Sequence, residues 1–188
     1  MSKIQLLYLF VLLIVIISIL GFNKARNTYN QISLVFSIID RSMSDEEKAI
    51  IIWEYMSSNT RHQCVAGTSD PIKVLELGYG CCDETARALK SLWMMAGLDS
   101  RICYMTFHTV PEVYYDGDWH MFDPDQKVFY LEEDNKTIAS VEEIVENPKL
   151  ITRTVNERGY STPEFLVSHY LRDYRQDSCP KDLLPPFL

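Results

Sequence analysis

Acidic residues are absent from the first 39 positions of this 188-residue chain, and the first of them is Asp40. Residues 4–22 lack charge of either sign, and nineteen such residues are about the length that a helix needs to cross a bilayer. The segment also lacks a convincing cleavage site, because Ile19 and Gly21 are not the pair of small residues that signal peptidase requires. We therefore expect residues 1–23 to form an uncleaved transmembrane anchor, with a cleaved signal peptide as the alternative.

Basic residues are outnumbered, with 18 Lys and Arg against 26 Asp and Glu, and the formal net charge is −8. Such a chain repels phosphate backbones and anionic lipid surfaces, so we expect no nucleic-acid partner and a purely hydrophobic membrane contact. Lys3 flanks one end of the apolar run, while Lys24 and Arg26 flank the other, so the basic residues set the orientation only weakly. We expect a single-pass membrane protein whose folded domain lies outside the cytoplasm.

The five cysteines include no pair at the CxxC spacing that is typical of zinc ligands. The acidic run Glu132–Asp134 lacks the spaced ligands and the glycine of a calcium-binding loop, so a solvated turn is the expected structure. We therefore expect no metal and no cofactor. An odd number of cysteines leaves at least one free thiol, and we expect Cys64, Cys103 and Cys179 to be small buried apolar residues.

The chain after the apolar run shows no internal repeat, and its patterns predict a linker over residues 24–43 and one folded domain over residues 44–188. A capping box at Ser44–Glu47 predicts a helix that ends near Asn59, and a second box at Ser140 predicts a short helix. Other helices are expected over residues 82–96, which precede Gly97, and from Thr162 onward. Residues 64–80 are expected to be a loop. Period-two patterns predict strands over residues 101–107, 110–115, 118–123 and 127–131.

Asp116-Gly117 is a typical two-residue hairpin turn, and it fixes the register of the strands around it. Tyr115 should pair with Asp118, so the numbers of every pair across the hairpin add up to 233. Val113 then faces His120, and His108 falls on the face opposite to His120. This register places Asp125 directly opposite His108 and makes Asp123 a diagonal neighbour of His108 on the same face, while His120 points away from them.

Two adjacent cysteines, Cys81 and Cys82, stand at the predicted start of the central helix. The unpaired N–H groups and the dipole of a helix start stabilise a thiolate, and a nearby imidazolium adds to this effect. His108 and Asp123 follow, which completes the thiol, imidazole and carboxylate of a cysteine acyl-transfer site. From the residues alone, either cysteine can be the nucleophile. A disulfide between adjacent cysteines is a strained and less favoured alternative.

Four histidines are candidates for the base of such a site, and each could equally be a surface or structural residue. They are His62, His108, His120 and His169. His120 is the nearest rival of His108, and Glu112 and Asp125 are alternatives to Asp123 as the carboxylate that orients the imidazole. Trp53, on the first predicted helix of the domain, is expected to be a core aromatic rather than a wall of the substrate cleft.

Three motifs, in this order along the chain, resemble the transglutaminase-like superfamily. They are Gly80-Cys81-Cys82 with Ala86, His108 with Glu112-Val113, and Trp119 with Asp123-Pro124. The resemblance implies an α+β fold of the papain type, with the nucleophile helix packed on an antiparallel sheet and here preceded by one transmembrane helix. It also implies that Cys82, four residues before Ala86, is the nucleophile, that His108 is the base and that Asp123 orients His108.

The resemblance implies a cysteine-dependent enzyme that cleaves or forms amide bonds through a thioester, as a peptidase, an amidase or a transglutaminase-type acyltransferase. The partners expected are a protein, a peptide or another amide-bearing substrate, together with the membrane. The alternative hypothesis is a membrane-anchored binding or assembly protein without catalysis, linked to surface polysaccharide. The reactivity of Cys82 separates the two hypotheses, because a binding protein needs no activated thiol.

Overall fold

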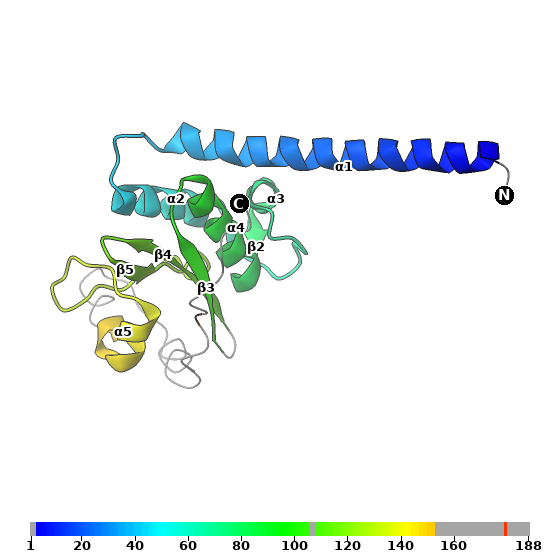
Figure 1. Ribbon diagram of the computed structural model, residues 1–188. Helices are drawn as coiled ribbons and strands as arrows, with labels where there is room; N and C mark the ends of the chain where they lie inside the picture. The colour runs from blue at the N-terminus through cyan, green and yellow to red at the C-terminus, as the bar shows by residue number, and fades with distance from the viewer. Residues whose placement is uncertain (1–2, 106–107, 153–178, 180–188) are drawn as a thin grey trace.

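A helix packed on a small antiparallel sheet forms the centre of the molecule (Figure 1). The computed structural model describes residues 3–105, 108–152 and Cys179. The helix is α4, Cys82–Met95, and the sheet has the order β3-β4-β5, formed by Ser100–Tyr104, Thr109–Tyr115 and Asp118–Met121. This arrangement confirms the α+β fold with the expected nucleophile helix packed on an antiparallel sheet.

The two faces of the sheet belong to two separate cores, because side chains alternate between faces along a strand. Val113 on one face packs with Trp93 of α4 and with the helix α2, Asp45–Asn59. Val110 on the other face packs with the short helix α5, Val141–Glu146. Both predicted capping boxes are present at the starts of α2 and α5, so the sequence located these helices correctly.

The hairpin has the predicted register. Tyr115 pairs with Asp118 and Val113 pairs with His120 across a turn in which Asp116 and Gly117 have φ values of 51° and 95°. The strand β5 ends at Met121, two residues earlier than expected. The strand expected over residues 127–131 was wrong, since that segment forms only isolated bridges, one of which joins Asp123 to Val128.

The segment expected to be a loop over residues 64–80 contains a helix, α3, Pro71–Leu77. Asp70 caps its start by accepting hydrogen bonds from the N–H groups of Ile72 and Lys73, and Gly78 ends it with a φ of 73°. Proline in the first turn and a left-handed glycine at the end are strong helix boundaries. The prediction of a loop was wrong because Pro71 and Gly78, which are also typical of loops, here mark the two ends of a short helix.

Two short parallel strands bring the segment before α3 beside the start of α4. They are β1, Arg61–His62, and β2, Tyr79–Gly80, with His62 opposite Gly80. The chain therefore approaches Cys81 and Cys82 as an extended strand and turns directly into a helix. A side chain at Gly80 would place its Cβ 3.0 Å from Cγ2 of Thr85, so any larger residue here would force the Thr85 side chain to shift.

The first helix, α1, spans Lys3–Ile38 and is the longest element (Figure 1). Within the described residues it is the one helix long and apolar enough to cross a membrane. The segment expected to be a linker differs from that expectation, because it is helical up to Ile38 and inserts Val35 into the core with no exposed surface. The side of the helix that faces the domain repeats at helical spacing, with Asn27 and Gln31 in its first part and Leu34 and Val35 in its second, which explains why residues 24–38 continue the helix. The division of the chain at residues 23 and 43 remains a prediction.

Candidate active site

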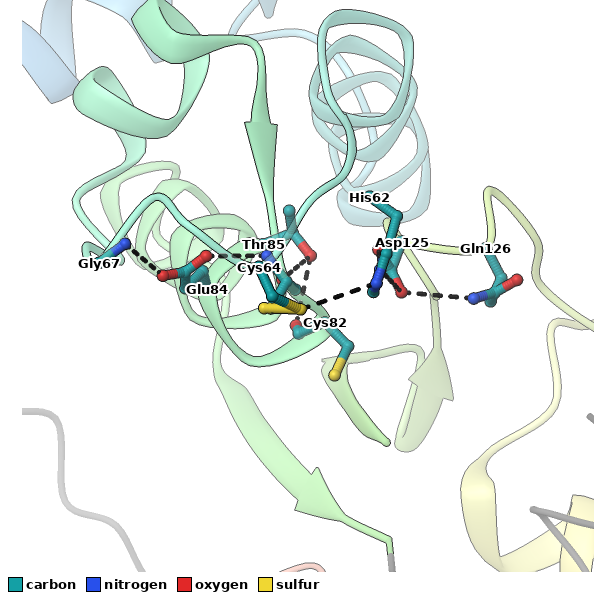
Figure 2. The surroundings of a disulfide bond; sticks show 9 residues. His62, Cys64, Gly67, Cys82, Glu84, Thr85, Asp125 and Gln126 are labelled. Atoms are coloured by element: carbon teal, nitrogen blue, oxygen red, sulfur yellow. Dashed lines mark hydrogen bonds and ion pairs between the residues drawn. A yellow bond between two sulfur atoms is a disulfide. The ribbon is translucent and has the colours of Figure 1, made fainter. Parts of the chain in front are cut away.

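Cys82 is the first residue of α4, and its side chain points away from the neighbouring disulfide (Figure 2). The preceding residue, Cys81, occupies the N-cap, and its N–H donates to Oε2 of Glu84 at 2.8 Å. N–H groups in the first turn of a helix have no partner within the helix, so this end of α4 favours negative charge. Cys82 therefore lies at the end of α4 that attracts anionic groups.

His108 and Asp123 form a buried pair, with 2.6 Å between Nε2 of His108 and Oδ2 of Asp123. Asp123 is fully buried and His108 is 8% exposed. The second oxygen of Asp123 accepts hydrogen bonds from the N–H groups of Asp125 and Gln126, each at 2.9 Å. These bonds hold the carboxylate in one orientation, so it can in turn fix the imidazole ring.

His108 interacts with the Cys82 side chain as well as with Asp123. Burial lowers the pKa of His108, but the Asp123 carboxylate and Cys82 outweigh burial and raise this pKa to about 10. The ring is therefore an imidazolium at neutral pH, placed between a sulfur and a carboxylate. The structure thus brings together the three residues predicted from the sequence, although His108 and Asp123 both lie beyond the ends of the paired strands rather than on them.

The His108–Asp123 pair makes the stability of the fold depend on pH. The pKa of His108 is about 10 in the folded chain and 6.5 in its unperturbed state, so folding favours the charged ring. The stabilisation is complete below about pH 6.5 and is lost as the pH rises towards 10. We expect the midpoint of urea unfolding to fall between pH 6 and pH 10 more steeply for the native chain than for Asp123→Asn. Equal slopes for the two proteins would contradict this coupling.

His120 has a structural role. Its ring stacks on Tyr115 with 3.7 Å between ring centroids, and its Nε2 lies 3.1 Å from the carbonyl oxygen of Tyr115. Its Nδ1 faces the carbonyl oxygen of Ile138. This arrangement agrees with the predicted register, in which His120 lies on the face opposite to Glu112 and Met121. His169 lies outside the described residues.

Glu112, an alternative for the orienting carboxylate, is used elsewhere. It is fully buried and receives hydrogen bonds from Nε of Arg101 at 2.6 Å and from the N–H of Val141 at 2.7 Å. The ring of Trp119 covers the guanidinium group of Arg101, whose Cζ lies 4.1 Å from a ring centroid. Glu112 therefore joins the sheet to the start of α5, on the face remote from α4.

We expect Glu112→Gln to destabilise the fold by about 3 kcal/mol, because it leaves the buried guanidinium of Arg101 without its counter-charge. The exposed Glu142 supplies a matched control, and Glu142→Gln should change the stability by less than about 0.5 kcal/mol. Chemical denaturation followed by circular dichroism measures both values. A loss of Cys82 reactivity without a loss of stability in Glu112→Gln would instead return Glu112 to the site.

Asp125, the other alternative, also pairs with a histidine. Its carboxylate oxygens lie 2.8 and 3.0 Å from Nδ1 of His62 (Figure 2). Burial raises the pKa of Asp125, and the contact with His62 opposes that shift. Asp123 and Asp125, on either side of Pro124, thus hold two different imidazole rings.

The cysteines correct one prediction, since four of the five are paired. Disulfides join Cys64 to Cys81 and Cys103 to Cys179, and Cys82 is the free thiol. Cys64, Cys103 and Cys179 are therefore not the isolated apolar residues that we expected. Partners 17 and 76 positions apart cannot be matched from spacing alone, because the fold decides which of them meet.

Trp53 contributes to the site in a way that the sequence did not reveal. It is a core aromatic, as expected, with 8% exposure. Its indole N–H also donates to the backbone carbonyl of Asp123 at 3.2 Å. A tryptophan on an apolar helix stripe carries no sign of such a bond, so only the folded structure shows that α2 positions the turn that presents Asp123.

The model of the Transglut_core family, described as the transglutaminase-like superfamily, matches residues 32–124, a range that includes Cys82, His108 and Asp123. Residues 32–124 belong to the transglutaminase-like superfamily. This membership supports a cysteine-dependent enzyme in general.

Two solved structures are similar to this chain. A candidate protease from Parabacteroides distasonis ATCC 8503 has 19% identity and a TM-score of 0.44 over 50% of this chain and 23% of its own. A candidate cysteine protease from Cytophaga hutchinsonii has 18% identity and a TM-score of 0.47 over 54% of this chain and 38% of its own. The matched region therefore spans well under half of either structure. No curated protein matches this chain.

Proposed function

We propose that this transglutaminase-like chain is a membrane-anchored cysteine enzyme that acts on amide bonds of proteins or peptides through a thioester. The observation that carries the proposal is the buried His108–Asp123 pair, with 2.6 Å between Nε2 and Oδ2, whose imidazole ring also interacts with the Cys82 side chain. These three groups have the chemical roles of a nucleophile, an acid–base and an orienting residue.

In the proposed reaction the Cys82 thiolate attacks the substrate carbonyl carbon, and the carbonyl π electrons move to the oxygen. The N–H of Cys82 at the start of α4 donates to that oxyanion. The His108 imidazolium gives its proton to the departing amine as the C–N bond breaks, which leaves a thioester. The neutral His108 then takes a proton from an attacking water or amine, and the thiolate leaves. Water gives hydrolysis, whereas an amine gives acyl transfer.

Residues 4–22 of α1 are proposed to anchor the chain in a membrane, with the enzyme domain outside the cytoplasm. The length and apolar composition of α1 support the anchor. Disulfides are typical of oxidising compartments, so the two disulfides support the external location, which the flanking basic residues left open.

A peptidyl electrophile tests the proposal. Incubation of the native chain near neutral pH, followed by peptide mapping, should find the label on Cys82. A library of peptide amides, with and without a biotinylated primary amine, then separates hydrolysis from transfer. Labelling of Cys82 no faster than that of an unfolded thiol, together with no turnover, would support the alternative hypothesis of a binding or assembly protein.

A further inference from the structure

A second sulfur site lies beside Cys82 and has no role in the proposed acyl transfer (Figure 2). The disulfide between Cys64 and Cys81 joins an exposed cysteine to the half-buried N-cap of α4. On the side of Cys64, Nε2 of His62 lies 3.7 Å from the sulfur. We propose that Cys64–Cys81 is a reversible dithiol-exchange site, and that its reduction switches off the neighbouring Cys82.

The environments of the two sulfurs suit different roles in thiol–disulfide exchange: Cys64 is suited to be attacked, and Cys81 is suited to leave. Cys64 is exposed, so a dithiol in solution can reach it. Cys81 stands at the start of a helix, where a thiolate is stabilised and therefore leaves readily. The arrangement favours attack at Cys64 with departure of Cys81.

The exchange has a simple balance. A thiolate of the dithiol attacks Sγ of Cys64, the bond to Cys81 breaks, and Cys81 departs as a thiolate. The second thiol of the reagent then displaces Cys64 and closes the disulfide of the reagent. Two electrons and two protons pass from the dithiol to the two cysteines, and the reverse sequence restores the bond.

His62 is placed to move one of these protons. Its Nδ1 lies 2.8 Å from Asp125, so in the neutral ring the proton sits on Nδ1 and Nε2 is the basic nitrogen. That nitrogen faces the Cys64 sulfur, where it can take the thiol proton during re-oxidation and return it during reduction. The buried carboxylate of Asp125 is thus a positioning residue for His62.

Other contacts hold the two segments together after the disulfide opens. The carboxylate of Glu84 bridges them by accepting from the N–H of Gly67 at 2.6 Å and from the N–H of Cys81 at 2.8 Å. Backbone pairing of β1 with β2 continues into a bond from the N–H of Gln63 to the carbonyl of Gly80 at 3.0 Å. The Cys64–Cys81 disulfide can therefore open and close without unfolding of the site.

The second disulfide of the chain is a built-in control. Cys103 and Cys179 have 0% and 5% exposure, and the Glu112 carboxylate lies 3.1 Å from the Cys103 sulfur. Burial and a neighbouring carboxylate both oppose the approach of an anionic thiolate. This pair should resist reductants that open Cys64–Cys81.

The loss of Cys82 reactivity on reduction rests on the proposed function of Cys82, and its cause is the negative charge that reduction places on Cys81. Reduction places a second thiolate, that of Cys81, at the same helix start. Two like charges at one helix end repel each other, so attack by Cys82 on a substrate or an electrophile becomes slower. A chain that is reduced before export would then stay inactive until oxidation outside the cytoplasm.

Graded dithiothreitol, alkylation of the exposed thiols and peptide mapping test the exchange site in the Cys82→Ser variant. Cys64 and Cys81 should become labelled while Cys103 and Cys179 remain bonded and the circular dichroism spectrum is unchanged. His62→Gln and Asp125→Asn should slow opening and closure about tenfold. Opening of both disulfides together, or unfolding along with the first, would overturn the site.

The switch is tested in the native chain by the rate at which iodoacetamide modifies Cys82. Reduction of Cys64–Cys81 should slow this rate about tenfold, and re-oxidation should restore it. An unchanged rate of Cys82 modification would contradict the switch but not the exchange site. A Cys82 that is slow in both redox states contradicts the proposed function, while the mapping of Cys64 and Cys81 still decides the exchange site.

Discussion

Replacement of Cys82 by alanine is expected to abolish amide turnover, with a loss of at least about a thousandfold, and to leave the fold intact. The sulfur is the group proposed to form the thioester, and no other described cysteine is free to replace it. Cys82 is only half-buried, so removal of its sulfur leaves little cavity in the core. Turnover of a peptide amide found by screening measures the loss, and unfolding in urea checks the fold.

Two further variants make this prediction specific to the triad. His108→Gln and Asp123→Asn should each remove most of the turnover, and the addition of either change to Cys82→Ala should cost almost nothing more. Residues that act as one unit show such non-additive losses. If Cys82→Ala kept its turnover, or if the losses multiplied, the three groups would not form one catalytic unit.

The three motifs of the resembled family indicated Cys82, His108 and Asp123, whereas the residues alone left the nucleophile, the base and the orienting carboxylate open. The hairpin register could also be calculated, since a two-residue turn at Asp116-Gly117 fixes every pair beside it. The side-chain alternation along the strands did not bring His108 to Asp123, however. Both residues lie beyond the paired strands. The turn after Asp123 orients the Asp123 carboxylate through hydrogen bonds from two backbone N–H groups, and the carboxylate thereby meets His108.

The features that the sequence did not reveal all depend on contacts between distant segments. Cys64 meets Cys81 because β1 and β2 pair side by side, and neither two-residue strand has a detectable period. The contact of His62 with Asp125 spans 63 positions, and that of Trp53 with Asp123 spans 70. Single residues of these types occur in many settings, so their partners become visible only in the folded chain.

The first helix joins the proposed membrane anchor to the folded domain without a break. Phe22 ends the apolar segment, and Asn27, about one and a half turns later, donates to the Asp70 carboxylate at the start of α3. At 1.5 Å per residue, this first contact lies about 8 Å beyond the apolar segment. The family match begins at residue 32, inside the same helix. With residues 4–22 in a bilayer, the domain would therefore sit directly on the membrane surface rather than on a flexible tether.

This continuity leads to a large expected effect of truncation. A chain of residues 24–188 should fold, whereas a chain of residues 44–188 should lose about 5 kcal/mol of its free energy of unfolding. The shorter chain lacks Val35 and Ile39, which are 0% and 9% exposed in the core around Trp93. Small domains have only about 5–15 kcal/mol of stability, so residues 44–188 should be largely unfolded near room temperature. Urea titration followed by far-UV circular dichroism measures the difference.

Two neighbouring residues of α1 supply the matched control within the 24–188 chain. Val35→Ala removes a fully buried side chain and should cost about 2 kcal/mol, because it leaves a cavity against the core. Phe36→Ala removes a larger side chain that is 47% exposed, and it should cost much less. Equal costs, or a 44–188 chain as stable as the longer one, would mean that α1 is only a tether. The contrast between a small buried residue and a large exposed one shows whether the second half of the helix belongs to the fold.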